Sequence, residues 1–173
     1  MGVQVVRFRD PTSVVSLHDL GGYPIDVMCP RCTGHALLVP DHTDPGPTKA
    51  WSRRRFVCPA CALTGSWSWR GQSLWWGGVV DPFFGQPLWL TTRVRGHLLW
   101  ALNRKHLDLL EQFVAAGLRE RGPNSGLREH VTSQGWNMSL IERLPLWMKS
   151  ARSRDDVLAA VARLRARLGD TGR

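Results

Sequence analysis

Two pairs of cysteines constrain this chain more than any other feature of its sequence. The pairs have the spacing Cys29-x2-Cys32 and Cys58-x2-Cys61, and residues 33–57 separate them. Each pair can place two thiolates on one side of a tight turn, and two such turns complete a tetrahedron around one Zn²⁺ ion. An iron centre or a pair of disulfides would use the same residues, but the spacing favours zinc. We therefore expect one structural zinc ion bound by these cysteines.

The sequence between the two pairs is strand-like on both sides of a loop. Residues 36–39 and 53–57 form the strand-like runs, and the second run leads directly into Cys58. Proline, aspartate and glycine dominate residues 40–47, which predicts the loop. The chain thus runs through a Cys-x-x-Cys turn (a knuckle), a strand, a loop, a second strand and a second knuckle. This order is the layout of a zinc ribbon.

In this region the chain resembles the zinc ribbons of the transcription-factor-IIB type, over about residues 27–70. The resemblance is carried by Cys29-Pro-Arg-Cys32-Thr33-Gly34 and Cys58-Pro-Ala-Cys61-Ala62. Both knuckles keep the family's proline, but neither has glycine directly after its second cysteine. The resemblance implies a small antiparallel ribbon. The segment from Leu88 to Leu168 is similar to the C-terminal half of uncharacterised bacterial zinc-ribbon proteins, which implies no particular activity.

Histidines near the cysteines, and those farther along the chain, are candidates for ligand or acid–base roles. Four thiolates already complete a zinc site, so His35 and His42 are interpreted as ordinary loop or surface residues. A closed site of this kind cannot activate water on the metal. The sequence has no GxSxG, GxxxxGK[ST], GxGxxG or HExxH motif. His97 and His106 remain as acid–base candidates, but neither has a recognisable catalytic partner at a telling spacing. We therefore expect that the protein is not an enzyme; a metal-free nuclease is the minor alternative.

The second half of the chain changes from a strand-like to a helical pattern. Residues 88–100 are strand-like, and Gly96 predicts a turn between two short strands. Helical periodicity then predicts a helix from about Asn103 to Arg121, with Asn103 as its N-cap. Its apolar face consists of Leu107, Leu110, Val114 and Leu118.

Further helices are expected toward the C-terminus. Ser139-Leu-Ile-Glu142 has capping-box spacing, and Pro145 is expected to start a new turn. Ser153 is expected to cap a last helix, whose apolar stripe is Val157, Val161, Leu164 and Leu168. The predicted fold class is therefore α+β: a small antiparallel zinc ribbon, a short β region and about three C-terminal helices.

The domain organisation predicted from these patterns has two parts packed as one compact unit. Residues 1–70 form the N-terminal segment and the ribbon, and residues 71–173 form a tryptophan-rich β segment and the helices. Within the second part, core packing is predicted for Trp75, Trp76, Phe83, Phe84, Trp89 and Trp100.

The chain is strongly basic, with a net charge of +9 at pH 7. This balance favours anionic partners, namely nucleic acid or an acidic protein surface. General solubility in an arginine-rich proteome is the plain alternative. No run of 18 apolar residues and no secretory signal is found, so we expect a cytoplasmic protein without a membrane partner. The oligomeric state does not follow from the sequence.

Basic and aromatic residues gather around the second cysteine pair. They are Arg53, Arg54, Arg55, Trp67, Trp69 and Arg70. Aromatic rings beside guanidinium groups can stack on bases while the cations meet phosphates. The competing interpretation is that Trp67 and Trp69 pack the ribbon onto the helical part. We expect a zinc-stabilised, non-catalytic nucleic-acid-binding protein; the alternative is an interaction adaptor that docks on an acidic partner.

Overall fold

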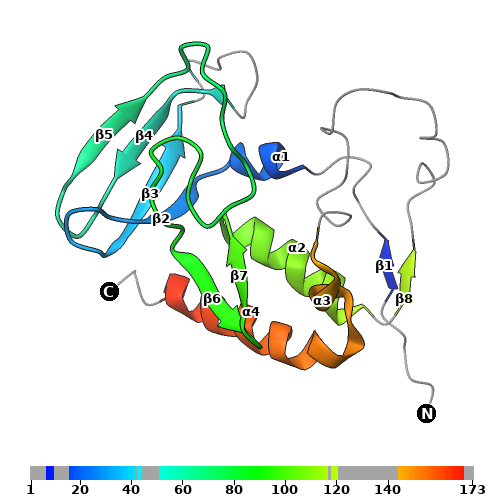
Figure 1. Cartoon of the computed structure of the whole chain (residues 1–173). Helices are drawn as coiled ribbons and strands as arrows, with labels where there is room; N and C mark the ends of the chain where they lie inside the picture. Colours follow the sequence, from blue (N-terminus) through cyan, green and yellow to red (C-terminus); the bar gives the residue numbers. More distant parts are fainter. Residues whose placement is uncertain are drawn as a thin grey trace, which may run out of the picture.

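The α+β fold class expected from the sequence is confirmed in the computed structural model (Figure 1). The structure describes residues 7–9, 16–41, 43, 51–116, 118–120 and 144–169. A four-stranded antiparallel sheet carries the cysteines, a β-hairpin follows it, and two long helices complete the fold. The elements named below keep the labels of Figure 1.

The four-stranded sheet has the order β2-β3-β4-β5, so each strand pairs with its neighbour in sequence. Its strands are β2 (Ile25–Met28), β3 (His35–Pro40), β4 (Arg54–Val57) and β5 (Thr64–Trp67). In β3, burial alternates from residue to residue, as expected for a sheet with one face on the core. Ala36, Leu38 and Phe56 point inward from the two central strands. The sheet therefore has a buried inner face, and its outer face is exposed at Arg55 of β4 but covered at Asp26 and His35.

The hairpin of β6 (Leu90–Val94) and β7 (His97–Ala101) continues the structure beyond β2. Arg95 and Gly96 form its turn, and both have positive φ, at 50° and 84°. Backbone hydrogen bonds join β2 to the residues just before β6, from Met28 N to Pro87 O and from Trp89 N to Asp26 O. The sheet and the hairpin are thus connected through the main chain, and their apolar residues belong to one core.

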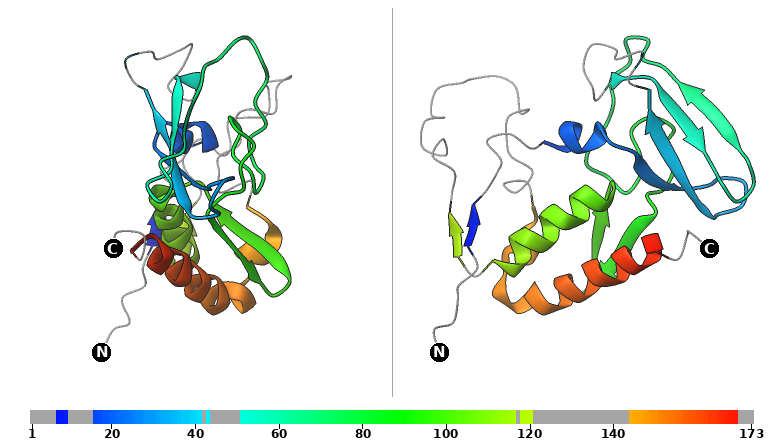
Figure 2. Two further views of the ribbon diagram at one scale, coloured as in Figure 1. Left: turned by 90° about the vertical axis from the view of Figure 1, so that its left-hand side faces the viewer. Right: turned by 180° about the vertical axis from the view of Figure 1, so that it is seen from behind.

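Two helices cover one face of the hairpin (Figure 2). They are α2 (Arg104–Ala115) and α4 (Arg154–Gly169), and α4 packs on both α2 and β6. The Asn103 side chain accepts from the backbone N–H of His106, which confirms it as the N-cap of α2. The predicted stripe of α4 is also observed: Val157, Val161 and Leu164 are buried.

Shorter elements complete the described chain. A capping box at Ser16 begins α1 (Leu17–Gly21), a helix the sequence analysis did not anticipate. Pro145 is the N-cap of α3 (Leu146–Lys149), as expected for a turn starting there, and the 3-10 turn η2 (Ala151–Ser153) leads into α4. The capping box expected at residues 139–142 lies outside the described residues.

Two expectations about the second half are wrong. Helix α2 ends at Ala115, and Leu118 belongs instead to β8 (Leu118–Glu120), which pairs in parallel with β1 (Arg7–Arg9). The helical spacing of Leu118 is therefore coincidental. Trp75 was expected in the core, but 77% of its surface is exposed. Glycine and proline around it form a loop that leaves the ring outside the packed layers.

Among the helices of the described residues, none combines the length and the apolar character needed to cross a bilayer.

Candidate metal centre

The four cysteines lie in two hairpin turns at the same end of the four-stranded sheet. Cys29 and Cys32 lie between β2 and β3, and Cys58 and Cys61 lie between β4 and β5. The same backbone hydrogen bond closes both turns, from Cys29 N to Gly34 O and from Cys58 N to Leu63 O, at 2.8 and 2.9 Å. The antiparallel pairing of β3 with β4 brings the two turns together. The sheet thus brings the two cysteine pairs together, as the sequence spacing predicts for a single metal site.

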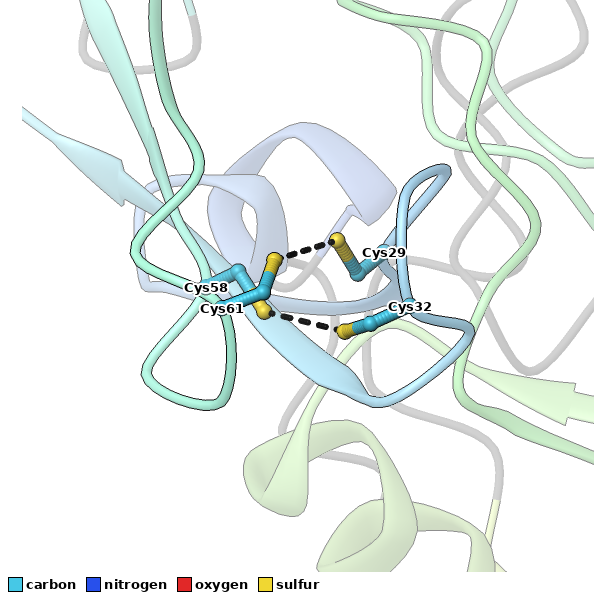
Figure 3. A group of neighbouring side chains, drawn as sticks. All are labelled: Cys29, Cys32, Cys58 and Cys61. Atoms are coloured by element: carbon cyan, nitrogen blue, oxygen red, sulfur yellow. Dashed lines mark hydrogen bonds between the residues drawn. The ribbon is translucent and has the colours of Figure 1, made fainter.

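The sulfur atoms form a compact group that fits one metal ion (Figure 3). Cys29 Sγ lies 3.6 Å from Cys61 Sγ, and Cys32 Sγ lies 3.6 Å from Cys58 Sγ. All four ligand atoms lie within 4.8 Å of one another. A tetrahedral centre with metal–sulfur bonds of about 2.3 Å requires sulfur–sulfur separations of about 3.8 Å. None of these four cysteines forms a disulfide, so all four sulfurs are available as metal ligands.

Ionisation within this group is unequal. Burial raises the pKa of Cys29, but hydrogen bonds from the backbone N–H groups of Cys32 and Arg31 outweigh it, and the pKa falls to about 6. The backbone N–H of Leu63 lowers the pKa of Cys61, but burial and the neighbouring sulfurs raise it more, to about 12. One thiolate forms readily, whereas a full set of four requires a cation to offset the accumulated negative charge.

The residue after each second cysteine has a left-handed backbone. The φ angles of Thr33 and Ala62 are 56° and 55°. Glycine adopts this conformation without strain, which explains physically why glycine suits the position that follows Cys-Pro-x-Cys. This chain has a side chain at both positions and keeps the same turn geometry.

His35 lies beside the centre but is not in its ligand group, and its interpretation as a loop or surface residue is wrong because it begins β3 with a largely buried side chain. Its Nε2 atom is 2.6 Å from Asp26 Oδ1, and both side chains are about nine-tenths buried. The His35 ring packs on Trp89, and the Arg167 guanidinium lies 4.7 Å from the centre of the Trp89 ring. His35 therefore links the first knuckle to the end of α4. His42, the other histidine considered as a ligand, lies outside the described residues.

The three consecutive arginines of the expected binding surface do not share one environment. Arg53 and Arg55 are exposed, but Arg54 is fully buried. The Arg54 guanidinium donates to Gly21 O and Tyr23 O and lies 4.5 Å from the centre of the Phe83 ring. Burial lowers the pKa of Arg54 to about 10. Its assignment to the binding surface is wrong, because strand alternation turns it into the core.

The two tryptophans of that surface also separate. Trp67 is half-buried, and its ring is T-shaped to that of Phe83, with 4.8 Å between centroids. It therefore packs inside the molecule, but on the segment between β5 and β6 and not on the helical part. Trp69 is 44% exposed, and its ring is T-shaped to that of Trp51, with 6.1 Å between the ring centroids. Arg70 is exposed next to it. The structure thus brings Trp51, which was not among the predicted site residues, to the side of Trp69.

Comparison with known proteins adds no relative to this description. No protein-family model matches the chain, and neither the curated proteins nor the solved structures give a match. The geometry alone therefore supports a four-cysteine site that could hold one metal ion on an antiparallel sheet, as in a zinc ribbon.

Proposed function

We propose that the centre holds one structural Zn²⁺ ion and that residues 27–70 form a ribbon of the transcription-factor-IIB type. Four thiolates with no protein oxygen or imidazole in the set suit zinc. The ion would join the two knuckles and stabilise a sheet whose strands have only four to six residues. Metal analysis of the purified protein tests this directly: one zinc per chain is expected, and stoichiometric iron would refute it.

We further propose that the protein binds single-stranded nucleic acid through a surface of Trp51, Trp69, Arg53, Arg55 and Arg70. The observation that carries this proposal is the exposed yet oriented ring of Trp69. Its Nε1 donates to Gln72 O at 3.2 Å, and the Gln72 side chain bonds back to Ser68 O and accepts from Arg70 N. The ring is therefore held in place while 44% of the residue's surface remains open to solvent.

A fixed, exposed aromatic ring beside cations matches the chemistry of unpaired nucleotides. Every base presents a flat π face, so stacking requires bases that are free of a duplex. Arg70 follows Trp69 directly, and Arg53 and Arg55 flank Arg54, which pairs with Trp67 across β4 and β5. All three arginines are exposed and supply positive charge to this surface. The proposed surface would therefore favour single strands and tolerate many sequences.

A salt titration of the affinity for a fluorescent single-stranded oligonucleotide tests this proposal. Three phosphate contacts predict a slope of about −2 in log affinity against log salt, a loss of about twentyfold between 50 and 200 mM. Trp69→Ala should weaken binding by about tenfold, since one base stack contributes about 1–3 kcal/mol. Trp69→Phe should retain most of the affinity, because it keeps a stacking ring.

Charge reversal provides the matched control. Arg53→Glu with Arg55→Glu should abolish binding, whereas Arg104→Glu with Arg163→Glu, at exposed positions on α2 and α4, changes the net charge equally and should have a much smaller effect. Equal losses from both would show that overall charge, and not this surface, drives association. Absence of binding to single- and double-stranded DNA and RNA at low salt would refute the proposal and favour an acidic protein partner.

A further inference from the structure

The two knuckles of the metal centre share one backbone hydrogen bond but differ in the exposure of their second cysteine residues. Cys29 and Cys58, the first cysteine of each knuckle, are each 1% exposed. Cys61 is partly buried, and Cys32 is exposed. Cys32 is therefore the most exposed residue of the ligand set, although both second cysteines are partly buried within the cluster.

The knuckles also differ at one equivalent position beside these second cysteines. Gly34 and Leu63 are equivalent, because their carbonyl oxygens accept the bonds from Cys29 N and Cys58 N that close the two turns. Leu63 is partly buried and packs against the core. A Cβ added at Gly34 would lie 3.3 Å from Cys32 Sγ and 3.6 Å from the Ala60 Cβ. The missing side chain at residue 34 thus leaves the side of the Cys32 sulfur uncovered.

The sulfur of Cys32 has a close partner across the centre. Cys58 Sγ lies 3.6 Å from Cys32 Sγ, compared with the S–S bond of about 2.05 Å that a disulfide needs. Cys58 is buried, so an external oxidant reaches Cys32 first and Cys58 is already positioned to react with the product. Oxidation of this pair would leave the metal with two thiolates instead of four.

We propose that the centre is a peroxide-responsive site in which Cys32 is oxidised first and Cys58 resolves it as a disulfide. The Cys32 thiolate attacks a hydroperoxide, forming a sulfur–oxygen bond and breaking the oxygen–oxygen bond, so that a sulfenic acid and hydroxide (or alkoxide) result. The Cys58 thiolate then attacks the Cys32 sulfur and displaces hydroxide. Two electrons pass to the peroxide, and solvent protons convert the released oxygens to water or alcohol. The inference rests on the metal occupancy proposed above and is independent of nucleic-acid binding.

Site-resolved oxidation of the purified, metal-loaded full chain tests this proposal. Metal content is measured first, so a protein without bound metal refutes the zinc proposal before any oxidant is added. Hydrogen peroxide is then added, metal release is followed with a chromophoric chelator, and non-reducing peptide mapping identifies the modified cysteines. We expect Cys32 to react first and a Cys32–Cys58 disulfide to form in step with metal release.

Two variants separate exposure of the sulfur from general instability. Gly34→Ala adds a methyl at a residue without positive φ, and this methyl would press on Cys32 Sγ at 3.3 Å. Metal release is therefore compared at equal metal occupancy, where it should slow by at least about threefold. Leu63→Ala opens the equivalent position and should accelerate modification of Cys61. If Cys61 or Cys29 reacts first in the wild type, or if Gly34→Ala leaves the rate unchanged, the proposal is overturned.

Discussion

Replacing Arg54 with methionine tests most directly how the sheet is joined to the rest of the molecule. Methionine keeps much of the length and apolar volume of arginine but removes its charge and its donors. Arg54 Nη2 lies 2.5 Å from Gly21 O, and Arg54 Nη1 lies 3.3 Å from Tyr23 O. Both carbonyls precede β2, so the arginine ties the end of α1 and the following turn to β4. The variant leaves these acceptors and the buried carboxylate of Asp81 without their cation.

The expected loss of stability follows from these contacts. Removing donors from two acceptors costs about 1–3 kcal/mol each, and breaking a buried charge interaction typically costs about 3–5 kcal/mol in total. We therefore expect Arg54→Met to lower the free energy of unfolding by about 3–5 kcal/mol. Arg55→Met, on the solvated face of the same strand, should change it by less than about 0.5 kcal/mol.

Urea unfolding at constant buffered free zinc, followed by tryptophan fluorescence, measures both variants on one scale. Constant free zinc is necessary because metal binding is linked to folding. A loss below about 1 kcal/mol for Arg54→Met, or equal losses for the two variants, would refute the anchoring role of Arg54. Binding measurements on the folded variants give a second contrast, since only Arg55→Met should weaken the proposed nucleic-acid complex.

Three further predictions concern buried or strained positions. Burial lowers the pKa of His106 from 6.5 to about 3. Between pH 6.5 and pH 3, His106 is therefore protonated in the unfolded chain but neutral in the folded chain. Stability should then fall as the pH drops below 6.5, by about 1.4 kcal/mol per pH unit, and His106→Asn should remove this share of the slope in paired unfolding curves at pH 7 and 5. Gly21→Ala places a Cβ 2.2 Å from the Trp76 ring, so thermal unfolding should show a loss of about 1–3 kcal/mol. Gly169→Ala, which meets nothing within 4 Å, should stay near the wild type. Ala62→Gly relieves a residue at φ 55° and should raise the urea midpoint, with a net gain of about 0.5–1 kcal/mol; a lower midpoint would contradict the strain argument.

Features set by neighbouring residues were predictable from the sequence. The two Cys-x-x-Cys turns, the strands between them and the hairpin turn at Gly96 all appear as expected. The N-cap at Asn103 and the apolar stripe of α4 do so as well. Each of these signals lies within a few residues, where turn chemistry and periodicity act without help from distant parts of the chain.

Features that depend on distant contacts were not predictable in the same way. The end of α2 and the pairing of Leu118 in β8 involve β1, more than a hundred residues earlier in the chain. Trp69 and Trp75 are both exposed, although Trp67 and Trp76, each one or two residues away, pack against the core. Periodicity could not separate these tryptophans from Trp67, which packs on Phe83.

The cysteine spacing by itself determined that this chain builds a four-cysteine site on an antiparallel sheet, because ligand geometry is encoded within each short turn. Only the tertiary structure decided which side chains around that ribbon face solvent. Alternation along β4 places Arg54 opposite its neighbours, but the buried side is defined by Gly21, Tyr23 and Phe83 from other segments. Burial is a property of what packs against a residue, and those partners are brought together only by the folded chain.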